Sequence, residues 1–328
     1  PGPICYGRGG SAVTVTDANL LLGYLNPDDF CAGRMTLRPA GVREALEAQV
    51  AAPLGLDWVA AAHGIYRLVD ANMANAIRRV AAQRGVDPRT LTMVAYGGNG
   101  PVHATAQAEE LGIGTVINFS GCPGDGPKAT KPNWVTCAWP PDYSEILEWQ
   151  WNEVVIPYWR EEAKFAKQNK VKVAFEMHPG FVVYNVDTML KLRDACGDAL
   201  GCNFDPSHLF WNGVDVCAAV RKLGDAIYHV HAKDCKVDPY NTAVNGCNDT
   251  KPYGDEINRS WIFRTVGYGH DYQTWKDLVS NLKMVGYDFV LSIEHEDSLM
   301  SSEEGFKKAV SFLKEVVIAE KAGAMWWA

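Results

Sequence analysis

The feature that most limits the fold is an alternation of short apolar segments and helical stretches in the last two thirds of the chain. The apolar segments show no polar residue at every second position, which is typical of strands buried on both faces of a parallel sheet. Strands that alternate with helices form right-handed strand–helix–strand units. The expected strands cover residues 114–121, 171–178, 200–208, 226–234 and 289–297, and the expected helices cover 145–168, 186–195, 214–223, 272–285 and 302–318.

Ionisable residues end four successive strands of this series. They are Glu176, His178, Asp205, His208, His229, His231, Lys233, Asp234, Glu294, His295, Glu296 and Asp297. The carboxyl ends of strands in a parallel barrel meet at one mouth, where active sites lie. A convergence of three carboxylates and one imidazole would be repulsive without a cation, and its mostly oxygen donors suit Mn²⁺, Mg²⁺ or Co²⁺ better than structural zinc. The alternative is a buried ion-pair network that includes Lys233 and Arg264.

The same strand ends carry motifs that resemble the sugar phosphate isomerase/epimerase family, which has a xylose-isomerase-like TIM barrel. The motifs are FEMHPG at 175–180, NFDPSH at 203–208, HVHAKD at 229–234 and SIEHED at 292–297. RTVGYGH at 264–270 and Trp139-Pro140-Pro141 fit a subgroup of that family. The resemblance extends from about residue 116 to 317 and covers strands four to eight of the barrel, so a partial barrel is expected.

Carried over residue by residue, the resemblance implies a site for a divalent metal and a sugar. The implied metal ligands are Glu176, Asp205, His231 and Glu294, and the implied substrate contacts are His208, His178, Lys233, Arg264 and His270. Glu176 and Glu294 would exchange protons with a sugar or sugar phosphate through a metal-stabilised enediolate, on one face for isomerisation or on two for epimerisation. His208 could instead be a hydrogen-bonding wall residue.

Two neighbours of these residues are expected to serve them indirectly. His229 is expected to point away from His231 and to pack or to support a ligand, and Glu296 could orient one. Both expectations come from the alternation of side chains along a strand.

A change in basic residues divides the chain near residue 115. Residues 1–115 contain 9 Arg and no Lys, whereas residues 116–328 contain 5 Arg and 17 Lys. Both side chains serve equally on most surfaces, so the change suggests two segments of different origin. The first segment has helical spacing at 40–51 and 57–84, with Asp17 expected as the N-cap of an earlier helix over 18–25. A strand at 91–96, a glycine turn at 97–101 and a helix at 102–111 follow, a pattern that is either a plain turn or a phosphate loop.

Three stretches of the first segment resemble the C-terminal part of hydantoinase A/oxoprolinase and acetone carboxylase subunits. They are GPICYGRGG at 2–10, TDAN at 16–19 and MVAYGGNGPVHA at 93–104. The resemblance implies an actin-like ATPase fragment with the 97–100 loop near a nucleotide, but the family's upstream phosphate loop and acidic metal residues are absent. We therefore expect an α/β hydantoinase A-like fragment at 1–115, joined to the barrel segment at 116–328 as a chimera.

Charge and composition bound the other functions. A net charge of −8 without a basic block argues against nucleic acid, and this disfavours the abasic-site endonucleases that use the same barrel. No apolar run long enough for a membrane span exists, and no signal peptide is expected at the Pro1-Gly2-Pro3 start. Nine cysteines without a C-x-x-C pair favour reduced thiols in the cytoplasm.

The expected partner is a small sugar or hydroxy-carbonyl compound. Three outcomes are open for the unrecognised half of the barrel: the first segment fills it, the chain forms homo-oligomers, or the fusion is catalytically silent. An ATP-dependent hydantoinase- or carboxylase-type subunit fragment is the alternative function.

Overall fold

The computed structural model describes residues 2–28, 30, 35–94, 100–320 and 323–325. They form two compact units. Unit 1 holds Pro1–Asn118, Cys122–Val155 and Phe165–Val171, and unit 2 holds Phe119–Gly121, Ile156–Lys164 and Lys172–Ala328. The expected α/β class is confirmed, and unit 2 contains a parallel half-barrel sheet.

Unit 1 is mostly helical. Its elements are a 3-10 turn (Ile4–Tyr6), α1 (Val15–Leu21), α2 (Val42–Leu46), a π-helical turn (Glu47–Ala51), α3 (Ala52–Leu54), α4 (Trp58–Gln83), a 3-10 turn (Pro88–Thr90), β1 (Met93–Val94), α5 (Gly100–Leu111), β2 (Thr115–Asn118), α6 (Pro141–Trp149) and a π-helical segment (Gln150–Val155). β1 and β2 pair in parallel. The glycine turn at 97–101, which is either a plain turn or a phosphate loop, lies largely outside the described residues.

The start of α1 corrects one expectation. Thr14, not Asp17, is the N-cap residue, because its side chain accepts from the backbone N–H of Asp17 while the Asp17 carboxylate accepts from Thr14 N at 2.9 Å. This reciprocal capping box lets the helix begin earlier than the Asp17 position suggests. Asp17 also accepts from Cys5 N at 2.8 Å, so it ties the N-terminal turn to α1.

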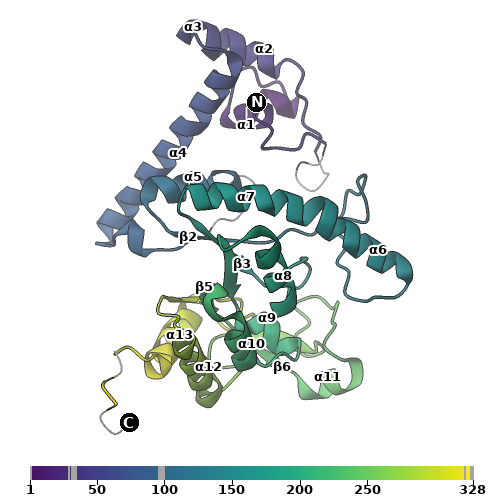
Figure 1. The fold of residues 1–328 in the computed structure, drawn as a ribbon, viewed down its shortest axis with the longest axis vertical. Helices are drawn as coiled ribbons and strands as arrows, with labels where there is room; N and C mark the ends of the chain where they lie inside the picture. Colours follow the sequence, from purple (N-terminus) through teal and green to yellow (C-terminus); the bar gives the residue numbers. More distant parts are fainter. Residues whose placement is uncertain (1, 29, 31–34, 95–99, 321–322, 326–328) are drawn as a thin grey trace. The chain divides into compact units, whose positions relative to one another are not determined.

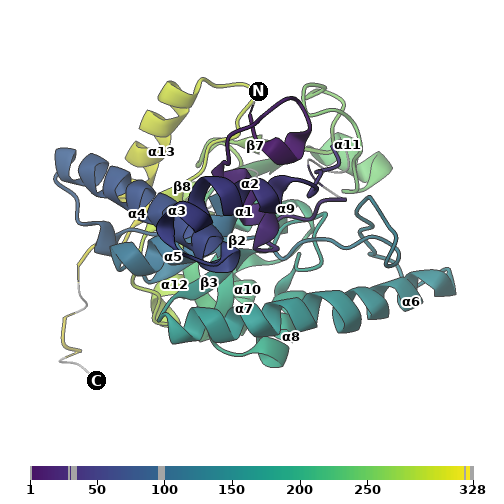
Figure 2. The ribbon, with the colours of Figure 1, turned by 90° about the horizontal axis from the view of Figure 1, so that it is seen from above.

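The long helix α4 organises the packing of unit 1. Its first half packs on α1 and α2 through Ala61 and Ala62, and its second half packs on α5 around Ala74. Figures 1 and 2 show these helices grouped along α4. Small residues on this face of α4 allow the close helix approach.

Unit 2 is built on four parallel strands in the order β3 (Lys172–Glu176), β4 (Leu200–Phe204), β5 (Ile227–Ala232) and β8 (Leu291–Ile293). β4 and β5 are buried along their whole length, as the lack of a polar residue at every second position predicts. The register places Glu176 opposite Asn203, Asn203 opposite His229, and His231 opposite Ser292. The carboxyl ends of all four strands therefore lie at one edge.

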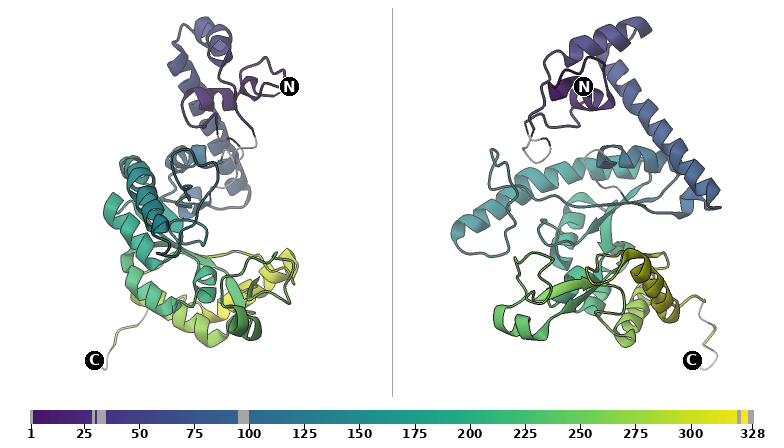
Figure 3. Two further views of the ribbon diagram at one scale, coloured as in Figure 1. Left: turned by 90° about the vertical axis from the view of Figure 1, so that its right-hand side faces the viewer. Right: turned by 180° about the vertical axis from the view of Figure 1, so that it is seen from behind.

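The helices of unit 2 follow the expected strand–helix alternation. They are α8 (Val186–Cys196), α9 (Pro206–Trp211), α10 (Val216–Leu223), a 3-10 turn (Gly224–Ala226), α12 (Tyr272–Met284) and α13 (Ser302–Val316), and α7 (Ile156–Gln168) contributes its first part. α12 and α13 lie side by side (Figure 3). The sequence did not predict α9.

An excursion between β5 and α12 was also missed. The antiparallel pair β6 (Asp234–Val237) and β7 (Trp261–Arg264) encloses α11 (Pro239–Asn245) and the loop that follows it. We call residues 238–260 the β6–β7 excursion. Among the helices in the described ranges, none has both the length and the apolar character needed to cross a membrane.

Candidate metal centre

Four side chains expected as metal ligands converge at the carboxyl edge of the unit 2 sheet. Glu176, Asp205, His231 and Glu294 each offer a donor atom, and these atoms all lie within 4.8 Å of one another. Each comes from the end of a different strand, so the sheet register brings them together. We call these four residues the acidic cluster.

Glu176 is a buried carboxylate that contacts two histidines. Its Oε1 lies 3.2 Å from His208 Nε2, and its Oε2 lies 3.1 Å from His231 Nδ1. Burial alone would raise the pKa of Glu176, but the hydrogen bonds and positive charge of the two histidines lower it well below the usual value. Glu176 is therefore held as a carboxylate.

Glu294 completes the contact around the imidazole. Its Oε2 lies 2.7 Å from His231 Nδ1, and its side chain is 31% exposed, compared with 4% for Glu176. Burial lowers the pKa of His231, but Glu176 and Glu294 outweigh it and raise the pKa to about 10. Without a metal, His231 thus carries a proton between two carboxylates.

Asp205 gives the observation that tests whether a cation fits. Its Oδ1 caps α9 by accepting from Ser207 N at 2.8 Å, but its fully buried Oδ2 accepts no hydrogen bond from any described residue. Burial raises the pKa of Asp205. A buried carboxylate oxygen without a partner is costly, and a ligated cation would remove the cost. The donor set of three carboxylates and one imidazole suits a divalent ion.

Lys233 neutralises only part of this charge. Its Nζ lies 2.9 Å from Glu294 and 2.5 Å from Glu296, but 3.9 Å from Asp205 Oδ2. The neighbouring carboxylates raise the pKa of Lys233 although burial opposes this. One lysine therefore faces several carboxylates, and Asp205 Oδ2 has only longer ion pairs, with His208 Nε2 at 3.5 Å and with Lys233.

Asn203 is a supporting residue that sequence reasoning missed. Its Nδ2 donates to Glu176 Oε2 at 3.1 Å, and its Oδ1 lies 2.8 Å from His229 Nδ1. The available signal was a polar residue inside the otherwise apolar strand LGCNF. Asn203 fixes the orientation of Glu176, as residues behind metal ligands do.

The expectation that His229 points away from His231 is wrong. Residues two positions apart on a strand share a face, and both imidazoles lie close to Asn203. Burial lowers the pKa of His229 to about 4, so the ring is neutral and supports the cluster through Asn203.

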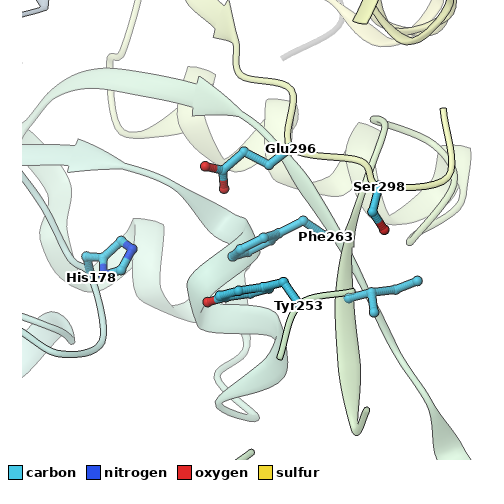
Figure 4. A pocket seen from close by; sticks show the side chains of 6 residues that line it. His178, Tyr253, Phe263, Glu296 and Ser298 are labelled. Carbon is cyan, nitrogen blue, oxygen red and sulfur yellow. The ribbon is translucent and has the colours of Figure 1, made fainter. Parts of the chain in front are cut away.

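A pocket of about 300 Å³ lies beside the acidic cluster. It is lined by His178, Tyr253, Ile262, Phe263, Glu296 and Ser298. Figure 4 shows Tyr253 and Phe263 next to one another, with His178 across the pocket. The pocket is linked to the cluster because His178 lies 4.2 Å from His208 between ring centroids and Glu296 is paired with Lys233. Burial, with the nearby charge of His208, lowers the pKa of His178 to about 4.

The two remaining expected substrate contacts are held by aspartates. Arg264 Nε lies 3.1 Å from Asp297, and His270 Nδ1 lies 2.8 Å from Asp234. Asp234 also accepts from the backbone N–H groups of Gly267, Gly269 and His270, so it shapes the loop after β7. Neither residue is among those that line the pocket.

Comparison with known proteins finds a family match in the first part of the chain. Residues 1–124 match the hydantoinase/oxoprolinase family. The acetophenone carboxylase gamma subunit of Aromatoleum aromaticum is 42% identical over 129 residues, which are 39% of this chain and 16% of that subunit. The chain thus spans about a sixth of this relative.

A different relative matches a longer stretch. The uncharacterized protein YfiH of Bacillus subtilis is 45% identical over 210 residues, which are 63% of this chain and 67% of YfiH. Among solved structures, the xylose isomerase domain protein from Planctomyces limnophilus is 17% identical with a TM-score of 0.48, covering 74% of this chain and 81% of that one.

Proposed function

The chain belongs to the family of the Bacillus subtilis protein YfiH, and we propose that it is a divalent-metal-dependent isomerase or epimerase of a sugar. The observation that carries this proposal is the acidic cluster, with its four donor atoms within 4.8 Å and with Asp205 Oδ2 buried without a hydrogen bond. Mn²⁺, Mg²⁺ or Co²⁺ is the proposed ion.

The proposed ligands are Glu176, Asp205, His231 and Glu294. A divalent ion bound there would polarise a carbonyl and the adjacent hydroxyl and so acidify the C–H bond between them. His231 would have to lose a proton before its ring nitrogen could bind the ion. Asn203 keeps Glu176 oriented through its 3.1 Å hydrogen bond.

Glu294 is the better placed of the two carboxylates to move a proton. Its side chain is partly exposed and only its Oε2 faces a histidine, whereas both oxygens of the buried Glu176 face histidines. Lys233 stays paired with Glu294 Oε1 at 2.9 Å. Burial raises the pKa of Glu294, but His231 and Lys233 lower it by more, so this carboxylate stays ionised. An ionised, accessible carboxylate is the form that a general base requires.

Deuterium exchange tests the proposal directly. Protein loaded with Mn²⁺, Mg²⁺ or Co²⁺ is incubated with a panel of ketoses and aldoses in D₂O, and NMR detects deuterium at the carbon next to the carbonyl. Exchange should need the metal and should be lost in Glu294→Gln. The matched control is Glu303→Gln, because Glu303 is an exposed carboxylate paired with Lys307 on α13. Exchange that persists in Glu294→Gln or in EDTA would overturn the proposal.

The first segment supports a second candidate function. Because residues 1–124 match the hydantoinase/oxoprolinase family, we also propose a chain joined from two families, whose first part is a piece of an ATP-dependent hydantoinase- or carboxylase-type subunit. Nucleotide binding to this piece predicts a rise in melting temperature with Mg²⁺ and ATP. No rise would leave the first part with a structural role.

A reducing compartment fits the thiols. The eight cysteines in the described ranges are all unpaired, and we propose a cytoplasmic location and a small-molecule substrate.

A further inference from the structure

The pocket beside the acidic cluster has one aromatic side that comes from the β6–β7 excursion and β7. Tyr253 and Phe263 lie nearly parallel, with 6.0 Å between ring centroids and 16° between planes. Tyr253 is 60% exposed although it is a large ring, and Phe263 is buried. An exposed aromatic ring at a pocket wall is available to the C–H groups of a ligand.

The excursion is built to hold Tyr253 in this place. The guanidinium of Arg259, itself buried, lies 4.4 Å above the Tyr253 ring and 4.7 Å from the Trp261 ring. The Asp249 carboxylate accepts from Ser260 N at 2.6 Å and from Lys251 N at 2.9 Å, which ties the loop to the start of β7. Tyr253 is therefore fixed by buried polar contacts and does not depend on the pocket's contents.

The polar side of the pocket carries negative charge. Glu296 and Ser298 line it together with His178. None of the described lining residues is a lysine or an arginine. The nearest buried cation, Lys233, is paired with Glu294 and Glu296. A site for a phosphate ester needs a basic group or a row of backbone N–H donors. The polar side of this pocket instead carries the Glu296 carboxylate.

Resting on the proposed function, we propose that this pocket is the specificity subsite and selects an uncharged monosaccharide over its phosphate ester. The C–H groups of the sugar pack against Tyr253 and Phe263. Its hydroxyl groups donate to the Glu296 carboxylate and interact with Ser298. The subsite thus recognises the part of the sugar that is not being isomerised.

Saturation-transfer NMR measures this contact without turnover. The whole chain is mixed with matched pairs of a sugar and its phosphate ester. The pairs are D-fructose with D-fructose 6-phosphate and D-xylulose with D-xylulose 5-phosphate, each measured with Mg²⁺ and without it. Competition between the members of a pair gives their affinity ratio. At least one neutral sugar should receive saturation from aromatic protons and should bind at least tenfold more tightly than its ester.

Four variants assign the effect to the pocket. Tyr253→Ala should weaken neutral-sugar binding about tenfold, and Tyr253→Phe should keep it. Tyr240→Ala removes an 82% exposed tyrosine of the same excursion that does not line the pocket, so it should change nothing. Glu296→Gln should reduce the preference for the neutral sugar, because it removes the charge that repels the phosphate.

The outcomes separate this inference from the proposed function, because calorimetric titration with Mn²⁺ is scored independently. Metal binding and deuterium exchange without any effect of Tyr253→Ala would overturn the subsite alone. Failure to bind metal, with sugar binding that still depends on Tyr253, would overturn the proposed function alone. Tighter binding of the phosphate esters, or no saturation of any neutral sugar, would overturn the subsite.

Discussion

Replacing Asp205 with Asn should change stability in opposite directions with and without metal. Asn keeps the size of the side chain and can still accept from Ser207 N at the start of α9, where it is as good an N-cap as Asp. The substitution removes the negative charge and the unpartnered Oδ2 acceptor. Without metal, the protein should gain stability, because a costly buried charge disappears.

The magnitudes follow from the environment of this oxygen. A buried polar atom without a partner costs about 1–3 kcal/mol, so Asp205→Asn should raise the free energy of unfolding by about 1 kcal/mol in EDTA. An ion at 100 times its dissociation constant stabilises the wild type by about 2.7 kcal/mol. For a chain of this size this corresponds to a rise in melting temperature of about 4 °C. The variant should lose most of this rise.

The assay is thermal and urea unfolding in EDTA and in Mn²⁺, with Asp215→Asn as the matched control. Asp215 is also an N-cap, at α10, and its exposed carboxylate accepts from Ala218 N at 2.9 Å away from the acidic cluster. The control should behave as the wild type in both conditions. A variant that is less stable than the wild type in EDTA, yet shows the full Mn²⁺ shift, would refute the reasoning.

Two further predictions test the frame around the site. Gly305→Ala should destabilise the protein by about 1–3 kcal/mol, because the added Cβ would overlap the His295 ring. Gly64→Ala in α4 meets open space and should stabilise the protein by up to about 1 kcal/mol. The midpoints of urea unfolding measure both effects. Burial raises the pKa of Asp249, but hydrogen bonds from Lys251 and Ser260 lower it from the ordinary value of 3.8 to about 2. The contribution of this carboxylate to stability is therefore present above pH 3.8 and is lost as the pH falls through 2. The stability gap between wild type and Asp249→Asn, about 1 kcal/mol after screening, should therefore be seen at pH 6 and close near pH 2; a constant gap would contradict it.

The acidic cluster could be predicted because a parallel sheet turns strand ends into neighbours. Glu176, His231 and Glu294 are far apart in the sequence, but each follows or ends an apolar strand, and the pattern of strands alone places their ends at one edge. The position of these side chains thus follows from the alternation of strands and helices, which the sequence shows without coordinates. Its assignment as a metal site stays a prediction.

The pocket could not be predicted, because its walls come from irregular chain. Tyr253 lies in a loop with no apolar period, and its position depends on Arg259 and Asp249, whose partners are backbone atoms reached across the excursion. The prediction of where α1 begins was wrong for a related reason. Thr14 and Asp17 form a reciprocal capping box, and the sequence does not show which of the two is the N-cap. The division of the chain at residue 115 also stays a prediction.

Arg264 bears on the choice between a metal site and an ion-pair network at the acidic strand ends. A buried ion-pair network would use both Arg264 and Lys233 to compensate the carboxylates, but Arg264 is bound to Asp297. Lys233 then remains, and it is committed to Glu294 and Glu296. A network that had formed for its own stability would give Asp205 Oδ2 a hydrogen bond, because a buried polar atom without one is destabilising. His208 Nε2 and Lys233 Nζ stop at 3.5 Å and 3.9 Å from this oxygen. The four donor atoms of the acidic cluster converge beside it, at the position a divalent ion would occupy.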